Sequence, residues 1–264
     1  MKPPKISLCG AVILLFCFWN CAERSPVSPL PFEENLEKVN GETTRTSERA
    51  LVIRNPLGGL IVTGSNARDV LRWSLTKIVS SRGGFAGGNE FAQIALQAAT
   101  RNDTLFFEII APGNSDALKY LCGLALVMPA NMACHVVSVG GLVNISNLDT
   151  TLSIAGAKYE INIAQHSGSL EVAAMQGSIA VENVLPDSGF CLVNTGQGNI
   201  AVKLPGNTSA QLHAYTSNGR VNSSGLVFTH ILELSPKTLR ATLGEGRGQI
   251  NLSTAHGDIS MQGF

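Results

Sequence analysis

The sequence has few charged residues and no excess of either sign. Charged side chains make up 14% of the 264 residues, against about 25% in an average soluble domain. Basic and acidic residues number 19 each, so the formal net charge is zero. A nucleic-acid-binding domain normally carries a basic patch, and a protein that docks on anionic lipid carries a basic cluster. The composition therefore argues against both kinds of partner.

The sequence also lacks a cluster of residues suited to hold a metal ion. Its five histidines are scattered, with no pair at the spacing of metal ligands. His166 and His256 stand just before glycines that open strand-like segments, where a turn role fits better than a ligand role. We therefore expect no metal and no cofactor.

The N-terminal apolar run is too short for a membrane-spanning helix, which needs about 20 residues. It extends over the 14 residues from Ile6 to Trp19 and follows Lys2 and Lys5. A basic start and a short apolar segment are typical of a secretory signal. We assign residues 1–20 to a signal peptide and expect an exported protein.

Cys21 and the Ser/Pro-rich stretch after it resemble a bacterial lipoprotein signal, in which the cysteine becomes the lipidated first residue. The resemblance implies lipidation at Cys21 and an N-terminal membrane anchor, although Phe18-Trp19-Asn20 departs from the small residues expected before such a cysteine. Simple cleavage and an uncleaved anchor are the alternatives. Ala22-Glu23 lacks the aspartate that marks inner-membrane retention in the resembling lipoproteins, which favours the outer membrane.

Residues 21–49 are rich in proline, serine, glutamate, threonine and asparagine and hold few large apolar side chains. Such a segment buries too little surface to offset its ordering entropy. We expect a flexible tether there and one folded domain over residues 50–264.

A short sequence motif that begins with glycine, here called a phrase, recurs through the second half of the chain. The second and fourth residues after the glycine are apolar, with a weaker copy at Gly219, where Val221 is followed by Ser223. The glycines are Gly141, Gly168, Gly177, Gly198, Gly219, Gly248 and Gly257. Alternation with a period of two is the signature of a strand with one buried face, and glycine permits a tight corner. Gly177, Gly198 and Gly219 are spaced by 21 residues and other pairs by 9, which favours a coil with more than one strand per turn.

The pattern predicts an all-β fold, a β-solenoid similar to a single-stranded β-helix, with a β-sandwich-like stack of short strands as the alternative. Before the repeats we expect strands at residues 50–55, 104–110 and 118–128. One short helix is expected after Asn89, because Phe91, Ile94 and Ala98 lie at helical spacing.

Five segments taken in order resemble the adhesin-like domain family of bacterial exported surface proteins. That family is related to the head (GIN-type) domain of proposed auto-transporter adhesins. The segments are Asn55…Gly59-Leu-Ile-Val, Val127-Met-Pro129, Leu204 to Ala210, Thr216 to Val221, and Leu243 to Ile259. The resemblance covers about Leu51 to Phe264 and implies a right-handed β-solenoid that is exported and tethered to a membrane. It supplies no catalytic residue.

The cysteines allow two interpretations. Cys122 and Cys134 flank the turn at Pro129 and would lie on neighbouring strands, which predicts a disulfide in an oxidising envelope. The alternative is that they are small buried apolar residues, which we prefer for Cys191 between Phe190 and Leu192.

Three classes of function remain, and we expect no enzyme. The first is a surface binding or adhesion module that meets a glycan or protein through outward-facing polar residues, which otherwise form an ordinary solvated face: Asn199, Arg220, Asn222, Gln249, Asn251 and Asp258. The second is an envelope structural or regulatory protein that captures a partner strand at an exposed edge near Ile259–Phe264. The third, a polysaccharide-acting β-helix enzyme, needs carboxylates that converge on one face, and Glu171 and Glu182 are the main outward pair.

Overall fold

The computed structural model divides the chain into two units, Met1–Pro31 and Phe32–Phe264. It describes residues 32–264 apart from 46, 56, 68, 83–88 and 159. The signal peptide assigned to residues 1–20 and the lipidation predicted at Cys21 lie outside the described residues. Among the described residues, no helix is both long enough and apolar enough to cross a bilayer.

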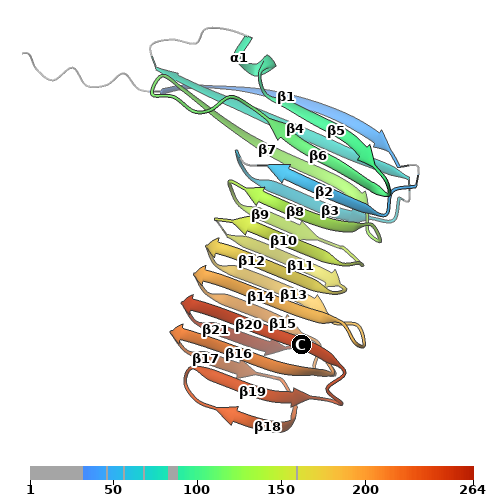
Figure 1. The fold of residues 1–264 in the computed structure, drawn as a ribbon, viewed down its shortest axis with the longest axis vertical. Helices are drawn as coiled ribbons and strands as arrows, with labels where there is room; N and C mark the ends of the chain where they lie inside the picture. Colours follow the sequence, from blue (N-terminus) through green and yellow to red (C-terminus); the bar gives the residue numbers. More distant parts are fainter. Residues whose placement is uncertain (1–31, 46, 56, 68, 83–88, 159) are drawn as a thin grey trace, which may run out of the picture. The chain divides into compact units, whose positions relative to one another are not determined.

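The second unit consists almost wholly of β-strands arranged in two sheets (Figure 1). The strands of the first, here called sheet A, are in spatial order β1 (Phe32–Thr44), β4 (Val70–Arg82), β7 (Leu118–Pro129), β3 (Leu60–Ser65), β9 (Val143–Ser146), β11 (Ile161–Ser167), β13 (Ile179–Val184), β15 (Ile200–Leu204), β21 (Ile259–Gly263) and β17 (Val221–Ser224). The strands of sheet B are β18 (Phe228–Leu234), β19 (Thr238–Leu243), β16 (Ala210–Asn218), β20 (Gly248–His256), β14 (Phe190–Gln197), β12 (Leu170–Gln176), β10 (Leu152–Ala157), β8 (Ala133–Val139), β2 (Ala50–Asn55), β6 (Thr104–Ile110) and β5 (Ala95–Arg101).

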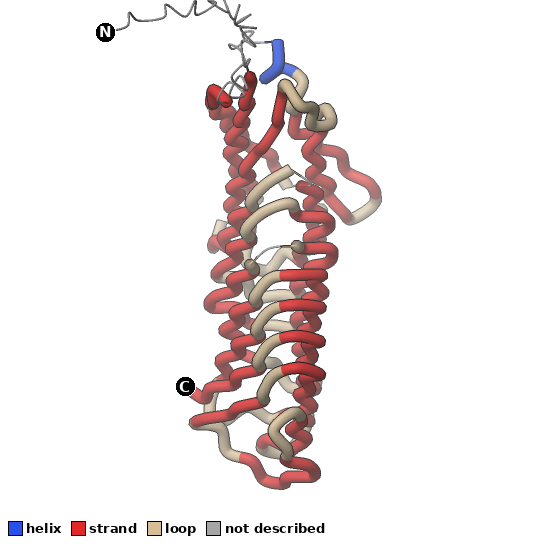
Figure 2. The backbone as a smooth tube through the Cα atoms, turned by 90° about the vertical axis from the view of Figure 1, so that its left-hand side faces the viewer, coloured by secondary structure: helices blue, strands red, loops and turns tan. Residues whose placement is uncertain are grey.

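From β8 to β15 the chain alternates between the sheets, so that one strand of each makes a rung. Successive rungs pair in parallel, as β10 does with β8 and β12 in sheet B. Figure 2 shows the two walls of strands joined by short loops at the corners. The β-solenoid predicted from the glycine repeat is confirmed, with two strands in each rung.

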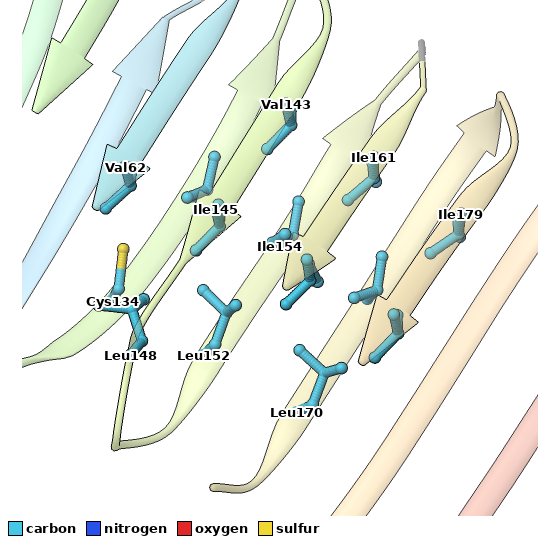
Figure 3. Packing of buried hydrophobic residues seen from close by; sticks show 14 of the residues in the cluster. Val62, Cys134, Val143, Ile145, Leu148, Leu152, Ile154, Ile161, Leu170 and Ile179 are labelled. Atoms are coloured by element: carbon cyan, nitrogen blue, oxygen red, sulfur yellow. The ribbon is translucent and has the colours of Figure 1, made fainter. Parts of the chain in front are cut away.

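The core lies between the two sheets and is built from the alternate apolar residues of each phrase (Figure 3). In sheet A, Ile161, Ile179, Ile200 and Ile259 occupy equivalent positions in neighbouring strands, and each is at most 1% exposed. A side chain of this size stabilises the fold by about 1.5–3 kcal/mol when it is fully buried. The solenoid, which forms a column of stacked rungs, is therefore stabilised by the sum of many equivalent contacts between neighbouring rungs.

The last rung in the sequence is not the last rung in space. Strand β20 lies between β14 and β16, and β21 lies between β15 and β17, in parallel pairing on both sides. After β15 the chain skips one place, builds β16 to β19, and returns to fill the gap. The prediction of an exposed strand edge near Ile259–Phe264 is therefore wrong, because β21 has a strand on each side.

The first rung is enclosed in the same way. Strand β2 lies between β6 and β8, and β3 lies between β7 and β9. The chain thus begins one place inside the column, crosses outward to form the strands beyond it, and returns at β8. Both ends of the solenoid are interlocked, whereas the rungs in the middle follow one another in sequence order.

The prediction of a flexible tether at residues 21–49 is wrong for residues 32–44. This segment is β1, which pairs antiparallel with β4 from Phe32↔Arg82 to Thr44↔Val70. Charge pairs contribute to this contact: Arg72 Nε lies 2.7 Å from Glu42 Oε1, and Lys77 Nζ lies 3.6 Å from Glu37 Oε1. A segment held in part by ion pairs gives little hydrophobic signal, which is why composition alone suggested a tether.

The helix expected after Asn89 is reduced to one turn, α1 (Asn89–Ala92). The residues that continued the helical spacing form β5, which pairs antiparallel with β6 from Ala95↔Ile110 to Arg101↔Thr104. Alanine, leucine and glutamine favour helices intrinsically. The backbone bonds available at the edge of β6 outweigh that preference, which amounts to only tenths of a kcal/mol per residue.

Candidate functional site

Four glycines stack at the corner where the chain leaves sheet B for sheet A, in the spatial order Gly177, Gly198, Gly257 and Gly219. A Cβ added to Gly198 would stand 2.2 Å from the carbonyl oxygen of Gly177, and one added to Gly257 would stand 2.1 Å from that of Gly198. The φ angles of Gly198 and Gly257 are 140° and 148°, which other residues rarely adopt. The glycine of each phrase is therefore a steric requirement of the corner.

A buried threonine ties each of these corners to the next. Thr195 Oγ1 donates to the carbonyl of Gly177 at 3.3 Å, and Thr254 Oγ1 donates to that of Gly198 at 3.0 Å. Thr216 Oγ1 donates to the carbonyl of Gly257 at 2.8 Å. Each threonine stands three residues before its own glycine, a regularity that our reading of the sequence missed and that marks the same corner.

The polar residues after the glycines also serve the corner. Asn199 Oδ1 accepts a hydrogen bond from the backbone nitrogen of Asp258 at 2.8 Å, and Asp258 Oδ1 accepts one from that of Arg220 at 2.8 Å. These side-chain oxygens therefore hold neighbouring rungs together.

The structure divides the six predicted binding residues among three places. Asn199, Arg220 and Asp258 lie at the corner, whereas Asn222 lies in β17 of sheet A. Gln249 and Asn251 lie in β20 of sheet B. The six therefore do not form one continuous surface. Alternation in the sequence identifies an outward-facing residue but does not say which sheet carries it, which is why the prediction grouped them.

The cysteines are all part of the core. Cys122, Cys134 and Cys191 are buried free thiols, and burial raises the pKa of each to about 12. Cys122, in β7 of sheet A, and Cys134, in β8 of sheet B, are both free, so the disulfide predicted between them is wrong. Thiols of this kind stay protonated at neutral pH and are poor nucleophiles.

His166 is a buried structural residue. Its Nε2 lies 3.0 Å from the carbonyl oxygen of Thr150, and its Nδ1 lies 2.7 Å from Asn183 Oδ1. Because a carbonyl oxygen only accepts, Nε2 carries the proton, and Nδ1 of the neutral ring then accepts from the Asn183 amide when that amide is turned to present Nδ2, which otherwise is buried without a partner. Burial lowers the pKa of His166, against the opposing effects of its hydrogen bonds with Asn183 and Thr150 and of the charge of Asp149. The ring is thus held neutral as a link between neighbouring rungs.

The two carboxylates considered for catalysis do not converge. Glu171 lies in β12 of sheet B and Glu182 in β13 of sheet A, and both occupy outward positions of their strands. They therefore face away from each other across the solenoid, although a glycosidase needs its pair within about 10 Å. In the part of the chain that the structure describes, no three His, Cys, Asp or Glu residues gather in an arrangement that would hold a metal ion.

The outer face of sheet A carries a row of side chains that crosses all ten strands, and all of them except Ile61 are short. Cross-strand pairing places its members side by side in the order Asn40, Ser74, Ala125, Ile61, Asn144, Asn162, Ala180, Ala201, Ser260 and Asn222. Ten strands at a spacing of about 4.8 Å give the row a length of about 43 Å.

Three hollows lie along this row. One of about 550 Å³ surrounds Ser74 and Ala125, one of about 240 Å³ surrounds Ala180 and Ala201, and one of about 210 Å³ surrounds Ser260. Their outer rims carry larger side chains, among them Arg72 and Lys203. We call the row and its hollows the sheet A groove.

Residues 134–262 match the family model Toastrack DUF4097. This part of the chain is a Toastrack domain. The match begins in β8 and ends in β21, so the Toastrack domain includes the regular rungs and the interlocked C-terminal rung. The resemblance found in the sequence motifs is confirmed over this region.

Among solved structures, the chain is similar to a candidate cell adhesion protein from Clostridium sporogenes, with 14% identity and a TM-score of 0.49 over 89% of this chain and 100% of the other. A candidate adhesin from Bacteroides fragilis shows 15% identity and a TM-score of 0.40 over 86% and 97%. One from Parabacteroides merdae shows 8% identity and a TM-score of 0.25 over 85% and 96%. None of the curated proteins matches the chain. Likenesses this distant give no argument about what the Toastrack domain binds.

Proposed function

We propose that this protein is a non-enzymatic binding module of the cell envelope that holds an extended neutral glycan in the sheet A groove. The observation that supports this most is the row of mostly short side chains that crosses ten strands, or nine strand spacings, over about 43 Å. Here Ser74, Ala125, Ala180 and Ala201 leave room for a chain to lie against the backbone.

The chemistry of the groove fits a sugar polymer better than a charged ligand. Asn162 and Asn144 present amides, with Asn162 Nδ2 donating to Asn144 Oδ1 at 3.2 Å, and each amide keeps further donor or acceptor capacity. Ile61 and Val127 are 50% and 39% exposed beside the largest hollow and offer apolar contact to the faces of sugar rings. Hydroxyl-rich rings use both kinds of contact.

The remaining classes have less support. The strand edge predicted near the C-terminus is occupied on both sides, and the carboxylates Glu171 and Glu182 lie on opposite faces. An N-terminal lipid anchor at Cys21 in the outer membrane belongs to the same proposal, because it would keep the binding module at the cell envelope. A diacyl or triacyl mass on the purified mature N-terminus would support this anchor, and an unmodified N-terminus would exclude it.

A bulky side chain on the floor of the groove tests the binding site. Ala201 is exposed in β15 of sheet A, and Ala173 is exposed in β12 of sheet B, so Ala201→Tyr and Ala173→Tyr make a matched pair. Retention of the full chain on immobilised neutral polysaccharides should fall by at least about tenfold, or 1.4 kcal/mol, for Ala201→Tyr only. Equal loss in both variants, or no retention of the unaltered chain by any neutral polysaccharide, would refute the groove as a glycan site.

A further inference from the structure

A ladder of asparagine amides on the floor of the sheet A groove stops after two strands. Asn162 Nδ2 donates to Asn144 Oδ1 at 3.2 Å, so the amides of the paired strands β11 and β9 form one step of a ladder. The next two positions in the row, in β13 and β15, are Ala180 and Ala201. Each alanine has the Cβ atom of an asparagine and lacks its amide. The ladder is therefore incomplete at these two positions.

The ladder is open on the side of these alanines. In a planar amide, one N–H bond and the C=O bond point in nearly opposite directions. Because the N–H of Asn162 is directed to Asn144 in β9, its Oδ1 is directed to β13, where Ala180 lies. Among the described residues, none donates a hydrogen bond to this oxygen. A further amide above Ala180, one strand spacing of about 4.8 Å away, would continue the ladder.

The hollow above the two alanines has the chemistry that such an amide needs. It has a volume of about 240 Å³, and Ala180 and Ala201 on its floor are both exposed. Glu182 and Lys203 lie at its rim as cross-strand partners, and neither forms an ion pair within the described part of the chain. The rim therefore offers one donor and one acceptor whose charges cancel, which suits a neutral polar group.

We propose that the glycan in the sheet A groove is a polymer of N-acetylated amino sugars, with one acetamido group seated above Ala180. This inference rests on the proposed function and deepens it by naming the class of sugar. With the sugar ring on the solvent side, the methyl group points to the Ala180 Cβ and the N–H donates to Asn162 Oδ1. The carbonyl then points to the Ala201 side, where Lys203 Nζ can donate to it. An acetamido group has both a donor and an acceptor, so it also completes the ladder if both asparagine amides are turned over, with Glu182 in place of Lys203.

Other substituents fit this place less well. A ring hydroxyl is shorter than an acetamido group and lacks the methyl that would cover Ala180 and Ala201. An unacetylated amino group is a cation that loses hydration against the two alanines, and Glu182 and Lys203 together give it no net attraction. The groove should therefore distinguish an acetylated amino-sugar polymer from its unacetylated form and from a plain glucose polymer.

Three polymers of glucose-type rings that differ at one ring carbon test the class of sugar. That carbon carries an acetamido group in chitin, an amino group in chitosan and a hydroxyl in cellulose. The full chain should be retained on chitin at least about tenfold more strongly than on the other two. If cellulose or another neutral polysaccharide without acetamido groups retains it as strongly as chitin, this inference is overturned and the groove proposal stands. Equal retention on chitin and chitosan would overturn the inference as well, and no retention on any neutral polysaccharide would refute both proposals.

Two pairs of variants test the position of the acetamido group. Ala180→Asn supplies the missing amide from the chain itself and should abolish the preference for chitin over cellulose, whereas Ala173→Asn, at an exposed position in β12 of sheet B, should keep it. Asn162→Ala removes the end of the ladder and should lower retention on chitin at least about tenfold. Asn194→Ala, which removes a cross-strand hydrogen bond on sheet B, should not. Circular dichroism checks that each variant is folded, and an unchanged preference for chitin in folded Ala180→Asn would overturn the proposal.

Discussion

Removal of the last 21 residues is expected to unfold much more than the end of the solenoid. A chain ending at Leu243 lacks β20 and β21, which lie between the rungs β14/β15 and β16/β17. Deletion therefore opens a gap inside the column and separates β16 to β19 from the remaining rungs. In a solenoid whose rungs followed sequence order throughout, the same deletion would remove only the final rung.

The magnitude follows from what these strands bury. Ile250, Leu252, Ile259 and Met261 are at most 2% exposed. At about 1.5–3 kcal/mol each, their burial stabilises the fold by about 6–12 kcal/mol, which is comparable to the total stability of a typical domain, about 5–15 kcal/mol. Backbone bonds on both sides are lost as well, such as those from Ile200 N to Asp258 O at 2.9 Å and from Ile259 N to Arg220 O at 2.8 Å.

Hydrogen exchange followed by mass spectrometry resolves where protection is lost. We expect the truncated chain to lose protection throughout β14 to β19 and to keep it in the rungs around β8 to β11, because each rung depends mainly on its neighbours. Urea unfolding should show an early transition for the C-terminal half. The reasoning is refuted if β16 and β17 stay protected in the truncated chain and the urea midpoint of the main transition is unchanged.

Two further perturbations concern the corners and the buried histidine. Gly198→Ala places a Cβ 2.2 Å from the Gly177 carbonyl oxygen and should lower the free energy of unfolding, measured in urea, by about 3 kcal/mol or more. Gly123→Ala, with open space around its Cβ, should lower it by less than about 1 kcal/mol. Similar losses in the two variants would contradict the steric account. Burial lowers the pKa of His166 in the folded state, so below the ordinary histidine pKa of about 6.5 the unfolded chain binds more protons than the folded chain. The contribution of His166 to stability is therefore fully present above that pH. As the pH drops below it, the free energy of unfolding should fall by up to about 1.4 kcal/mol per pH unit. His166→Gln should flatten this acid dependence and His256→Gln should not; an unchanged slope in His166→Gln would show that another group titrates.

The alternation of apolar residues predicted the inward face of the rungs correctly. Ile179, Ile200 and Ile259 were expected inside from their distance to a glycine, and all are buried. Local geometry decides this, since period two leaves one face for the core. The strand at 104–110 was predicted with its observed bounds for the same reason.

The order of the rungs was not predictable from the pattern. Strands β14, β20 and β16 have the same alternation, and Cys191, Ile250 and Leu212 occupy equivalent buried positions. Any of these strands would bury the same face against any other, so the choice of neighbour depends on loop lengths and on packing far along the chain. The sequence pattern therefore specifies a rung without specifying its place.

The same limit applies to the candidate site. The small residues Ala180 and Ala201 stand 21 positions apart, and Ser260 comes 59 positions after Ala201. Only the parallel pairing of β13, β15 and β21 places them side by side. The sheet A groove is thus a property of the assembled solenoid. Of the six polar residues that we selected from the sequence, three belong to the corner, two to sheet B, and only Asn222 lies in the groove.

The interlocked ends have a consequence for how such proteins gain or lose rungs in evolution. Between β8 and β15 each rung follows its predecessor in sequence, so duplicating or losing one rung there leaves the interlocked ends untouched. An insertion in the regions β2 to β7 or β16 to β21 would displace a strand that two others enclose. We therefore expect natural variation in rung number among Toastrack proteins of this type to fall in the middle of the column, with both ends inherited as complete units.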